Sequence, residues 1–313
     1  MISIEHIRSI CSGRLAISEP LAGMTTFRIG GPADIFVEPL SVDELIALVA
    51  TFRDSDLPFI VLGNGSNVLI SDDGFRGAAI SLEAGFSHAR FVDGIVDAGA
   101  GMRLSAFVDF CIRHALADTE ALAGIPGTLG GAVVMNAGAY GSEISRDLVD
   151  VTVIRNGEAI TLRASECGFR YRGSDLGRDI VLSARFAFPE GDVEVMKRRR
   201  KELLLKRNNA QPTVFPNAGS IFKNPTGAFA AVLIQECGLK GFRIGGAEVS
   251  ELHANFIIGR DHATAAEILA VINHLRDVVY RERGVALELE IRLVGFPENA
   301  LAALAAPGEG ASA

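Results

Sequence analysis

Between Leu122 and Gly141 the chain carries six glycines, one proline and no charged residue, in the run LAGIPGTLGGAVVMNAGAYG. A glycine inside a helix or strand costs about 0.5–1 kcal/mol relative to alanine, so this composition does not suit an element of a hydrophobic core. Backbone without side chains can instead approach a flat or anionic ligand closely. A membrane span would also fit the length, but Pro126 and the glycines would break a lone helix, and irregular backbone facing lipid is not tolerated. We therefore expect a ligand-binding stretch and no membrane insertion.

Length and charge limit the classes of protein that remain. A chain of 313 residues is long enough for two or three domains. The net charge of −8 argues against general nucleic-acid binding, which needs clustered Lys and Arg against phosphates. The basic run Lys197–Lys201 lies among strong helix formers. We interpret it as a solvated helix face rather than a phosphate site, because charge runs of this kind are usually exposed to water.

Cysteine spacing and the N-terminus indicate the compartment. The four cysteines are scattered and form no C-x-x-C pair, so neither a zinc nor a redox motif is present and no metal is predicted. Without a disulfide pattern, a reducing compartment is expected. The opening MISIEHIRSI carries charges where a signal peptide would be apolar. These features predict a cytoplasmic protein, and we expect its Ala- and Gly-rich tail, residues 301–313, to be frayed.

Hydrophobic periodicity predicts a mixture of helices and strands without a regular βαβ alternation, which is typical of an α+β fold. Helices are predicted at Ser41–Phe52, near Leu104–Ala115, at about Asp192–Leu205, at Ala228–Cys237 and at Thr264–Arg283. Strands are predicted at Phe59–Leu62, Val68–Ile70, Ile95–Ala98, Val149–Ile154, Glu158–Leu162, Val181–Phe188 and, from strict alternation, Val285–Val294.

Capping and turn residues sharpen several of these boundaries. Ser41 with Glu44, and Thr264 with Glu267, have the spacing of capping boxes. Gly238 and Gly284 are expected to end the helices before them. Asn156-Gly157 between two apolar runs predicts a hairpin.

The run LGNGSNVLIS, Leu62–Ser71, is a second glycine-rich feature. Its glycines would let successive backbone N–H groups converge, and its short polar side chains add donors, so the turn could bind a pyrophosphate. No Gly-Lys-Ser/Thr follows, so this is not a Walker loop. Gly99-Ala100-Gly101 lacks the third glycine of a Rossmann fingerprint. For LGNGSNVLIS, an ordinary hairpin turn remains the alternative.

Six motifs occur in one order along the chain. They are LGNGSNVLIS, LAGIPGTLGGAVVMNAGAYG, YRGS (Tyr171–Ser174), NAGSIFKNP (Asn217–Pro225), GLKGFRIGGAEVSELHANF (Gly238–Phe256) and GVALELEIRLVG (Gly284–Gly295). Together they resemble the UDP-N-acetylenolpyruvoylglucosamine reductases, flavoenzymes that complete UDP-N-acetylmuramic acid for the bacterial cell wall. The resemblance covers about Thr25 to Gly295, nearly the whole chain.

The resemblance implies a fold and a cofactor. Two N-terminal subdomains of the vanillyl-alcohol-oxidase (PCMH) type would bind FAD and precede a C-terminal α+β substrate-binding domain. A break near Pro189–Gly191 is a plausible boundary, giving domains 1–70, 71–190 and 191–300, with 301–313 as a tail. The residues implied to bind FAD are Gly63, Asn64, Gly65, Ser66, Asn67, Val68, Gly124, Ile125, Pro126, Gly127, Thr128, Gly130, Gly131, Asn136, Gly138 and Tyr140.

The resemblance also implies a two-stage reaction. NADPH reduces the flavin, and the enolpyruvyl group of the UDP-sugar then takes the hydride on its β-carbon and a proton on its α-carbon. By motif, Arg172 would hold the substrate carboxylate as a planar, always-protonated fork. Glu290 would be the second polarising group, protonated if buried, and Ser220 would donate the proton. Asn224 would bind substrate, and the neighbouring Lys223 could meet a phosphate.

Each of these residues has an ordinary alternative role, since most polar residues are simply exposed. Glu288 competes with Glu290, which we prefer because it directly precedes the pair Ile291-Arg292. We interpret His253 as structural. Only about 35 residues separate Ser174 from Gln211, which leaves little room for the substrate-covering tyrosine loop of some members, so the residues that cover the uridine diphosphate stay open.

Two other functions are compatible with parts of the pattern. A flavin oxidase or dehydrogenase of the same fold would act on an alcohol or hydroxy acid, but it need not carry NAGSIFKNP with a downstream ELEIR. A nucleotide-binding module that has lost catalysis would be expected to have replaced Ser220, Arg172 or Glu290, and all three are present. Protein partners and oligomeric state are not indicated.

Overall fold

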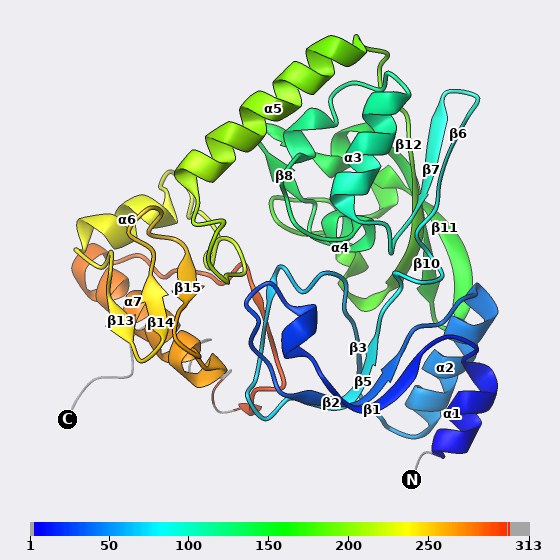
Figure 1. Ribbon diagram of the computed structural model, residues 1–313, viewed down its shortest axis with the longest axis horizontal. Helices are drawn as coiled ribbons and strands as arrows, with labels where there is room; N and C mark the ends of the chain where they lie inside the picture. The colour runs from blue at the N-terminus through cyan, green and yellow to red at the C-terminus, as the bar shows by residue number, and fades with distance from the viewer. Residues whose placement is uncertain (1–2, 299, 301–313) are drawn as a thin grey trace. The chain divides into compact units, whose positions relative to one another are not determined.

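The computed structural model describes residues 3–298 and 300 (Figure 1). The tail predicted at 301–313 lies outside these residues. The chain forms two compact units, and each consists of several segments. Unit 1 comprises Met1–Ser18, Asp34–Asn64 and Gly77–Arg207, and unit 2 comprises Glu19–Ala33, Gly65–Arg76 and Asn208–Ala313. The domain boundaries at 70/71 and 190/191 remain a prediction.

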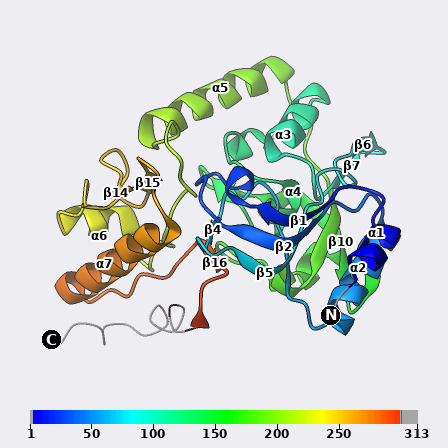
Figure 2. The same cartoon turned by 60° about the horizontal axis from the view of Figure 1, so that its bottom comes forward.

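The first part of the chain builds a four-stranded sheet in the order β1-β2-β5-β3. Its strands are β1 (Leu15–Pro20), β2 (Pro32–Val37), β5 (Phe75–Ile80) and β3 (Phe59–Val61), with β3 parallel to β5. Helices α1 (Ile4–Ile10) and α2 (Val42–Asp54) lie side by side in unit 1 (Figure 1 and Figure 2). Ile7 of α1 and Leu45, Leu48 and Phe52 of α2 are fully buried in the core of that unit.

A five-stranded antiparallel sheet forms the larger part of unit 1, in the order β11-β10-β12-β7-β6. Its strands are β6 (Ala89–Val92), β7 (Ile95–Gly99), β10 (Leu148–Arg155), β11 (Glu158–Arg163) and β12 (Ile180–Phe186). Helices α3 (Leu104–Arg113) and α4 (Leu129–Val134) contact one another, and α4 contacts β12. The aromatic ring of Phe107 from α3 lies 5.1 Å from that of Phe186 in β12, which fastens the helix to the sheet.

A two-stranded ribbon, one long helix and several 3-10 turns make up the remaining elements. The two-stranded ribbon of β8 (Gly138–Ala139) and β9 (Ser142–Glu143) follows α4. The long helix α5 (Val193–Ala210) contains the basic run and confirms the helix predicted there. Several of its charged side chains form ion pairs: Lys197 with Glu194, Arg199 with Glu202, and Arg200 with Asp109. The 3-10 turns are η1 (Ala22–Met24), which belongs to unit 2, and η2 (Glu120–Leu122), η3 (Ile144–Asp147), η4 (Ala164–Glu166) and η5 (Asp175–Arg178) of unit 1.

Unit 2 contains an antiparallel sheet, β13 (Arg243–Ile244), β14 (Ala247–Val249) and β15 (Ile257–Gly259). Helices α6 (Ala230–Glu236) and α7 (Ala265–Arg283) lie side by side, and α7 contacts all three strands (Figure 2). The buried face of α7 includes Ile268, Val271, Ile272 and Leu275. A separate parallel pair, β4 (Val68–Ile70) with β16 (Arg292–Val294), belongs to the same unit.

Sequence signals at helix ends and turns are largely confirmed. The Oγ1 of Thr264 accepts a hydrogen bond from the N–H of Glu267, whose carboxylate accepts one from the N–H of Thr264. Gly284 ends α7 in the left-handed conformation, with φ 66°. The hairpin at Asn156-Gly157 forms as predicted, with Arg155 opposite Glu158. None of the helices in the described part of the chain combines the length and apolar character that a membrane span requires.

The capping box predicted for α2 is only half formed. Ser41 accepts a hydrogen bond from the N–H of Glu44, as expected. The Glu44 carboxylate, however, accepts hydrogen bonds from the Ser12 hydroxyl and from the N–H of Leu40 instead of that of Ser41. These bonds, the one from Ser12 foremost, lower the pKa of Glu44. A partner distant in sequence has therefore taken the place of the local one.

Two predictions about strands are wrong. The alternating segment at 285–294 forms a strand only at Arg292–Val294, because before it only Leu289 finds a bridge partner, Phe222. The alternation still appears in how far the side chains are buried, since Leu287 and Ile291 are buried and Glu288 is exposed. The hairpin alternative for LGNGSNVLIS is also wrong, since β3 pairs with β5 and β4 with β16.

The glycine-rich stretch contains a core element after all. Helix α4 occupies Leu129–Val134 and buries Leu129, Ala132 and Val133. The expectation that nothing in the stretch suits a core element is therefore wrong. The helix begins after Thr128, which is extended, and the left-handed or extended backbone needed before it is provided by Gly124 and Gly127, with φ 80° and 150°.

Candidate active site

In unit 1 the two segments that were predicted to bind FAD meet at Gly63 and Thr128. A Cβ atom at Gly63 would clash with the Oγ1 and Cγ2 atoms of Thr128, so only glycine allows this approach. Gly63 follows β3, and Thr128 precedes α4. Two loops about 65 residues apart in sequence thus come together, and the Thr128 side chain fills the space that a side chain at position 63 would need.

Asn64, beside Gly63, is held by a residue that the sequence did not single out. The guanidinium of Arg103 donates a hydrogen bond to the Oδ1 of Asn64. The same guanidinium is paired with Glu83, at 2.9 Å between Nη2 and Oε2. The side chain of Asn64 is therefore oriented by an Arg–carboxylate pair whose members lie outside every motif.

The other glycines of the stretch lie in different surroundings. Gly130 lies against Ala100, where a Cβ would come within 2.8 Å of the alanine Cβ, and its N–H donates to the Ala100 carbonyl. Its lack of a side chain is therefore required by protein packing. Gly131 is exposed, and its only near neighbour at a Cβ position is the Thr128 Oγ1 at 3.5 Å. The main chain of Ile125 donates to Leu122, and that of Gly127 accepts from Leu104, while Pro126 is exposed.

The end of the stretch is tied to helix α5. The Tyr140 hydroxyl donates to the carbonyl of Leu203 at 3.1 Å, and the Nζ of Lys206 lies 5.5 Å from the Tyr140 ring centre. Gly138 lies in β8, where a Cβ would clash with the Ser142 carbonyl. Burial lowers the pKa of Arg207 on the same helix. Tyr140 is thus anchored by its hydroxyl and remains 39% exposed.

Arg172 occupies the corner of a tight turn in unit 1. Its φ is 55°, in the left-handed region that residues with a Cβ rarely adopt. Its guanidinium carbon lies 5.0 Å from the ring centre of Tyr171, in cation–π contact. The residue is half-buried.

In unit 2 the segment that carries Ser220 pairs with the segment that carries Glu290. The N–H of Glu290 donates to the Ile221 carbonyl, and the N–H of Lys223 donates to the Glu288 carbonyl, both at 2.8 Å. This short ladder therefore places Glu290 opposite Ile221, next to Ser220. Within the described residues the half-buried Ser220 hydroxyl has no hydrogen-bond partner, so it can donate a proton outward.

A buried asparagine that the sequence analysis missed fixes this ladder from the other side. Asn255 is 3% exposed. Its Oδ1 accepts from the N–H of Phe222 at 3.0 Å, and its Nδ2 donates to the Phe222 carbonyl at 2.8 Å. Its own carbonyl accepts from the N–H of Ile221. Three hydrogen bonds thus hold the two residues that follow Ser220.

The second half of the first glycine loop, from Gly65 to Val68, belongs to unit 2. Gly65, with φ 58°, approaches Met24 and Thr25 so closely that a Cβ would clash. The Nδ2 of Asn67 donates to the carbonyl of Glu290 at 3.1 Å, and the Asn67 carbonyl accepts from the N–H of Arg292. Ser66 is half-buried, and Val68 begins β4. The loop and Glu290 are therefore joined inside one unit.

The remaining residues predicted to bind substrate are engaged with protein. Lys223 forms an ion pair with Glu288, the residue that competed with Glu290 in the sequence. The Oδ1 of Asn224 accepts from the N–H of Ala230 at 3.1 Å, which caps the start of α6 and leaves its Nδ2 free to donate. His253 packs edge-on against Phe256, and burial lowers its pKa. This agrees with a structural rather than a basic role for His253.

A pocket of about 220 Å³ opens in unit 2 beside this segment. Its lining combines apolar, amide and hydroxyl side chains with one carboxylate, Glu251, and one guanidinium, that of Arg260, whose carbon lies 4.4 Å from the ring centre of Phe215. The lining residues are Asn208, Gln211, Pro212, Thr213, Val214, Phe215, Ser250, Glu251, Leu252, Ile258 and Arg260.

The class of protein follows from the fold of the first half and from its glycine loops. Residues 33–165 match the FAD binding domain family, and this range contains Gly63, Thr128 and the loops around them. The nearly open space at Gly131 fits a cofactor lying on main chain. The fold and the site define an FAD-containing oxidoreductase, and the predicted α+β class with a vanillyl-alcohol-oxidase-type FAD-binding fold and a C-terminal domain is confirmed.

The second half identifies the family. Residues 211–294 match the C-terminal domain of UDP-N-acetylenolpyruvoylglucosamine reductase. A reductase of that name from Chloroherpeton thalassium is 45% identical over 309 residues, covering 96% of this chain and 99% of the relative. One from Heliobacterium modesticaldum is 44% identical, covering 90% and 91%. The crystal structure of UDP-N-acetylenolpyruvylglucosamine reductase from Thermus caldophilus superposes with a TM-score of 0.77 at 35% identity, covering 90% of this chain and 98% of that one. The chain belongs to the UDP-N-acetylenolpyruvoylglucosamine reductase family, as its motifs predicted.

Proposed function

We propose that the chain catalyses the NADPH-dependent reduction of the enolpyruvyl group of UDP-N-acetylglucosamine-enolpyruvate to UDP-N-acetylmuramate, a step of peptidoglycan precursor synthesis in the cytoplasm. Cell-wall biogenesis, cell shape and cell division depend on such precursors. The observation that carries the proposal is the ladder of unit 2. It fixes Ile221, the residue after Ser220, opposite Glu290, in a chain whose first half is an FAD-binding domain.

When bound, FAD would supply hydride transfer between NADPH and the enolpyruvyl substrate. Gly63, Asn64, Thr128 and Gly131 would provide the main-chain and amide surface that holds it in unit 1. By its motif, Gly65–Val68 would offer converging N–H groups to a pyrophosphate.

Arg172 binds the substrate carboxylate in this proposal. As hydride reaches the β-carbon, negative charge builds up over the α-carbon and its carboxylate. A guanidinium is always protonated and offers paired donors, so it stabilises this charge more strongly in the transition state than in the ground state. The strained backbone of Arg172 fits such a role, because strain of this kind clusters at functional sites.

Ser220 then delivers a proton to the α-carbon. A serine hydroxyl is a weak acid, so its efficiency depends on fixed position and on a neighbour that polarises the substrate. The ladder supplies the position, and Glu290, held by Asn67 and Ile221, is the neighbour. Asn224 offers its free Nδ2 group to the substrate, and Lys223, paired with Glu288, could exchange that partner for a phosphate.

The test follows the two halves of the reaction separately. The purified holoenzyme should be yellow, and NADPH should bleach it in the absence of oxygen. The enolpyruvyl UDP-sugar should then restore the colour and yield UDP-N-acetylmuramate. A colourless protein that does not take up FAD would contradict the proposal. A reduced protein that is reoxidised by a carbonyl compound, the product of alcohol oxidation, but not by the UDP-sugar would also contradict it.

A further inference from the structure

The turn that carries Arg172 is closed on itself. The N–H of Arg170 donates to the Gly173 carbonyl at 3.0 Å, and the N–H of Gly173 donates to the Arg170 carbonyl at 3.1 Å. Tyr171 and Arg172 therefore occupy its two corners, and Arg172 has a φ of 55°. Such a conformation persists only when the surrounding structure over-determines it, so the contacts that restrain the turn bear on where the guanidinium of Arg172 points.

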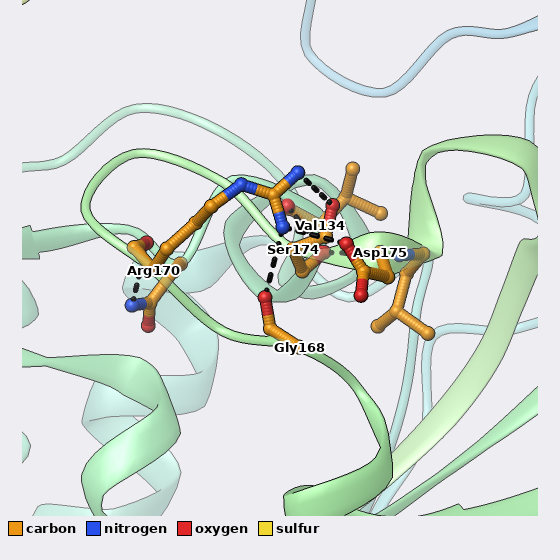
Figure 3. Close-up of polar contacts among 7 residues, drawn as sticks. Val134, Gly168, Arg170, Ser174 and Asp175 are labelled. Atoms are coloured by element: carbon orange, nitrogen blue, oxygen red, sulfur yellow. Dashed lines mark hydrogen bonds and ion pairs between the residues drawn. The ribbon is translucent and has the colours of Figure 1, made fainter.

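The first restraint is the side chain of Arg170, which lies across the base of the turn (Figure 3). Its Nη1 donates to the Gly168 carbonyl at 3.0 Å and to the Asp175 carboxylate at 2.6 Å. Its Nη2 donates to the Ser174 carbonyl at 3.2 Å. One planar guanidinium thus joins the chain entering the turn to the chain leaving it.

The second restraint comes from beneath the turn and is buried. Asn136, which follows α4, is 1% exposed. Its Nδ2 donates to the Arg170 carbonyl at 3.1 Å and to the Glu143 carboxylate at 2.7 Å, and its Oδ1 accepts from the N–H of Ser145. Both amide hydrogens are used, so the side chain is committed to protein partners.

A third contact completes the attachment of the turn to α4. The Oγ of Ser174 donates to the carbonyl of Val134, the last residue of α4, at 2.7 Å (Figure 3). The turn is therefore fastened to the end of the helix that begins at Thr128, beside Gly63.

We propose that Arg170 and Asn136 are positioning residues for Arg172, holding its turn in the left-handed conformation against the end of α4. The inference rests on the proposed role of Arg172 at the substrate carboxylate. Arg170 belongs to none of the residues assigned to substrate or cofactor. Asn136 was assigned to FAD by its motif, but both of its side-chain amide hydrogens are donated to protein, so here it acts on the turn and not on the cofactor. They act by fixing the backbone from which the Arg172 guanidinium projects, and small misplacements of such a group are costly in rate.

The experiment compares the two half-reactions in the holoenzyme for Asn136→Ala, Arg170→Gln and Arg170→Lys. The matched control is Arg199→Gln, which breaks an exposed arginine–carboxylate pair of the same unit, with Glu202 on α5. We expect Asn136→Ala to slow the reoxidation of reduced enzyme by the UDP-sugar by about 10–100-fold and Arg170→Gln by about 3–10-fold, the order expected for misplacement rather than removal of the group. Reduction by NADPH, FAD content and the control should be unchanged. Arg170→Lys should recover part of the loss.

The decisive readout is the same set of changes made in an Arg172→Ala background. If Arg170 and Asn136 act through Arg172, they should cause no further slowing once its side chain is gone. Equal slowing in both backgrounds would overturn the inference while leaving the role of Arg172 intact. If Asn136→Ala slows both half-reactions and loses FAD, that variant is damaged in general. The test of the inference then rests on Arg170→Gln, which changes an exposed side chain.

A structure of the Arg170→Gln variant provides a readout that does not depend on the proposed reaction. The φ of Arg172 should leave the left-handed region, or the turn should separate from Val134. An unchanged turn would overturn the inference. If Arg172→Ala itself leaves reoxidation by the UDP-sugar unchanged, the proposed role of Arg172 fails, and this structure still tests the positioning claim.

Discussion

In unit 1 the predicted functional residues lie on loops with unusual backbone, whereas in unit 2 they lie on a short ladder with ordinary backbone. Asn136, Tyr140 and Arg172 of unit 1 all have φ between 44° and 55°. Ser220 and Glu290 of unit 2 do not have a positive φ. Holding a non-glycine residue in the left-handed region costs about 1–2 kcal/mol. In unit 1 the predicted functional residues are thus held on strained backbone. In unit 2 they are positioned by main-chain hydrogen bonds between two segments.

This difference shows where each region is vulnerable. A strained loop depends on side-chain restraints such as Arg170 and Asn136, so single changes should displace it without unfolding the unit. A ladder depends on buried partners of its main chain, such as Asn255, so changes there should lower stability.

The largest effect in unit 1 is expected at Arg172. Arg172→Ala removes the only group of unit 1 assigned to the substrate carboxylate, and losing such a stabilising donor typically costs about 10²–10³-fold in rate. The UDP-sugar half-reaction should fall by that factor while the NADPH half-reaction stays unchanged, as measured by anaerobic stopped-flow absorbance. The exposed Arg178→Ala of the same unit serves as control. An equal fall in both would contradict the assignment.

Asn255→Ala should lower stability instead of acting on one half-reaction. It leaves the buried N–H and carbonyl of Phe222 without partners, at about 1–3 kcal/mol for each group. We expect the free energy of unfolding to fall by about 2–4 kcal/mol in denaturant titration, with exposed Asn209→Ala as control. A variant as stable as the parent protein would show that the ladder is held by other contacts.

Gly63→Ala should weaken FAD binding. Its new Cβ would overlap Thr128, and relief by backbone movement in a packed region costs about 1–3 kcal/mol. The apoprotein can relax by such movement, whereas bound FAD would hold the loop in place, so the cost falls on binding. It corresponds to a roughly 5–150-fold rise in the Kd for FAD, measured by fluorescence titration of the apoprotein. Gly177→Ala, where a Cβ meets nothing within 4 Å, is the control. Unaltered FAD binding would place the cofactor surface elsewhere.

The smallest effect concerns Glu120, 8% exposed in η2 just before the glycine-rich stretch. Burial raises its pKa above 4.5. A carboxyl with a raised pKa in the folded state binds its proton more tightly than when unfolded, so its contribution is present below pH 4.5 and is lost as pH rises. Glu120→Gln should therefore raise Tm by about 1–3 °C at pH 7 and have little effect near pH 4. A Tm difference independent of pH would contradict this.

The sequence predicts elements best where a local signal decides them. Thr264, Glu267 and Gly284 define α7 because capping needs only neighbouring residues. Prediction from the sequence fails where partners distant in the chain determine the structure. The Glu44 carboxylate accepts a hydrogen bond from Ser12, and within Val285–Ile291 only Leu289 has a bridge partner, Phe222. In the glycine-rich stretch, the short apolar run of α4 was hidden by the glycines around it.

The candidate site divides in the same way. Residues inside motifs, such as Ser220 and Arg172, could be named from the sequence. Asn255 and Arg170 could not, because their roles are hydrogen bonds to main chain that no spacing predicts. Asn255 lies within the HANF motif, two residues after His253, and its place between the apolar residues Ala254 and Phe256 was the only signal in the sequence.

The central claim is that Ser220 delivers the proton in the second half of the reaction. The most direct measurement is anaerobic stopped-flow of Ser220→Ala, in which bleaching by NADPH and recovery with the enolpyruvyl UDP-sugar are followed in turn. The account predicts unchanged bleaching and a recovery slower by about 10²–10⁴-fold, the range for loss of a positioned general acid. Recovery at the parent rate, or equal slowing of both phases, would contradict it.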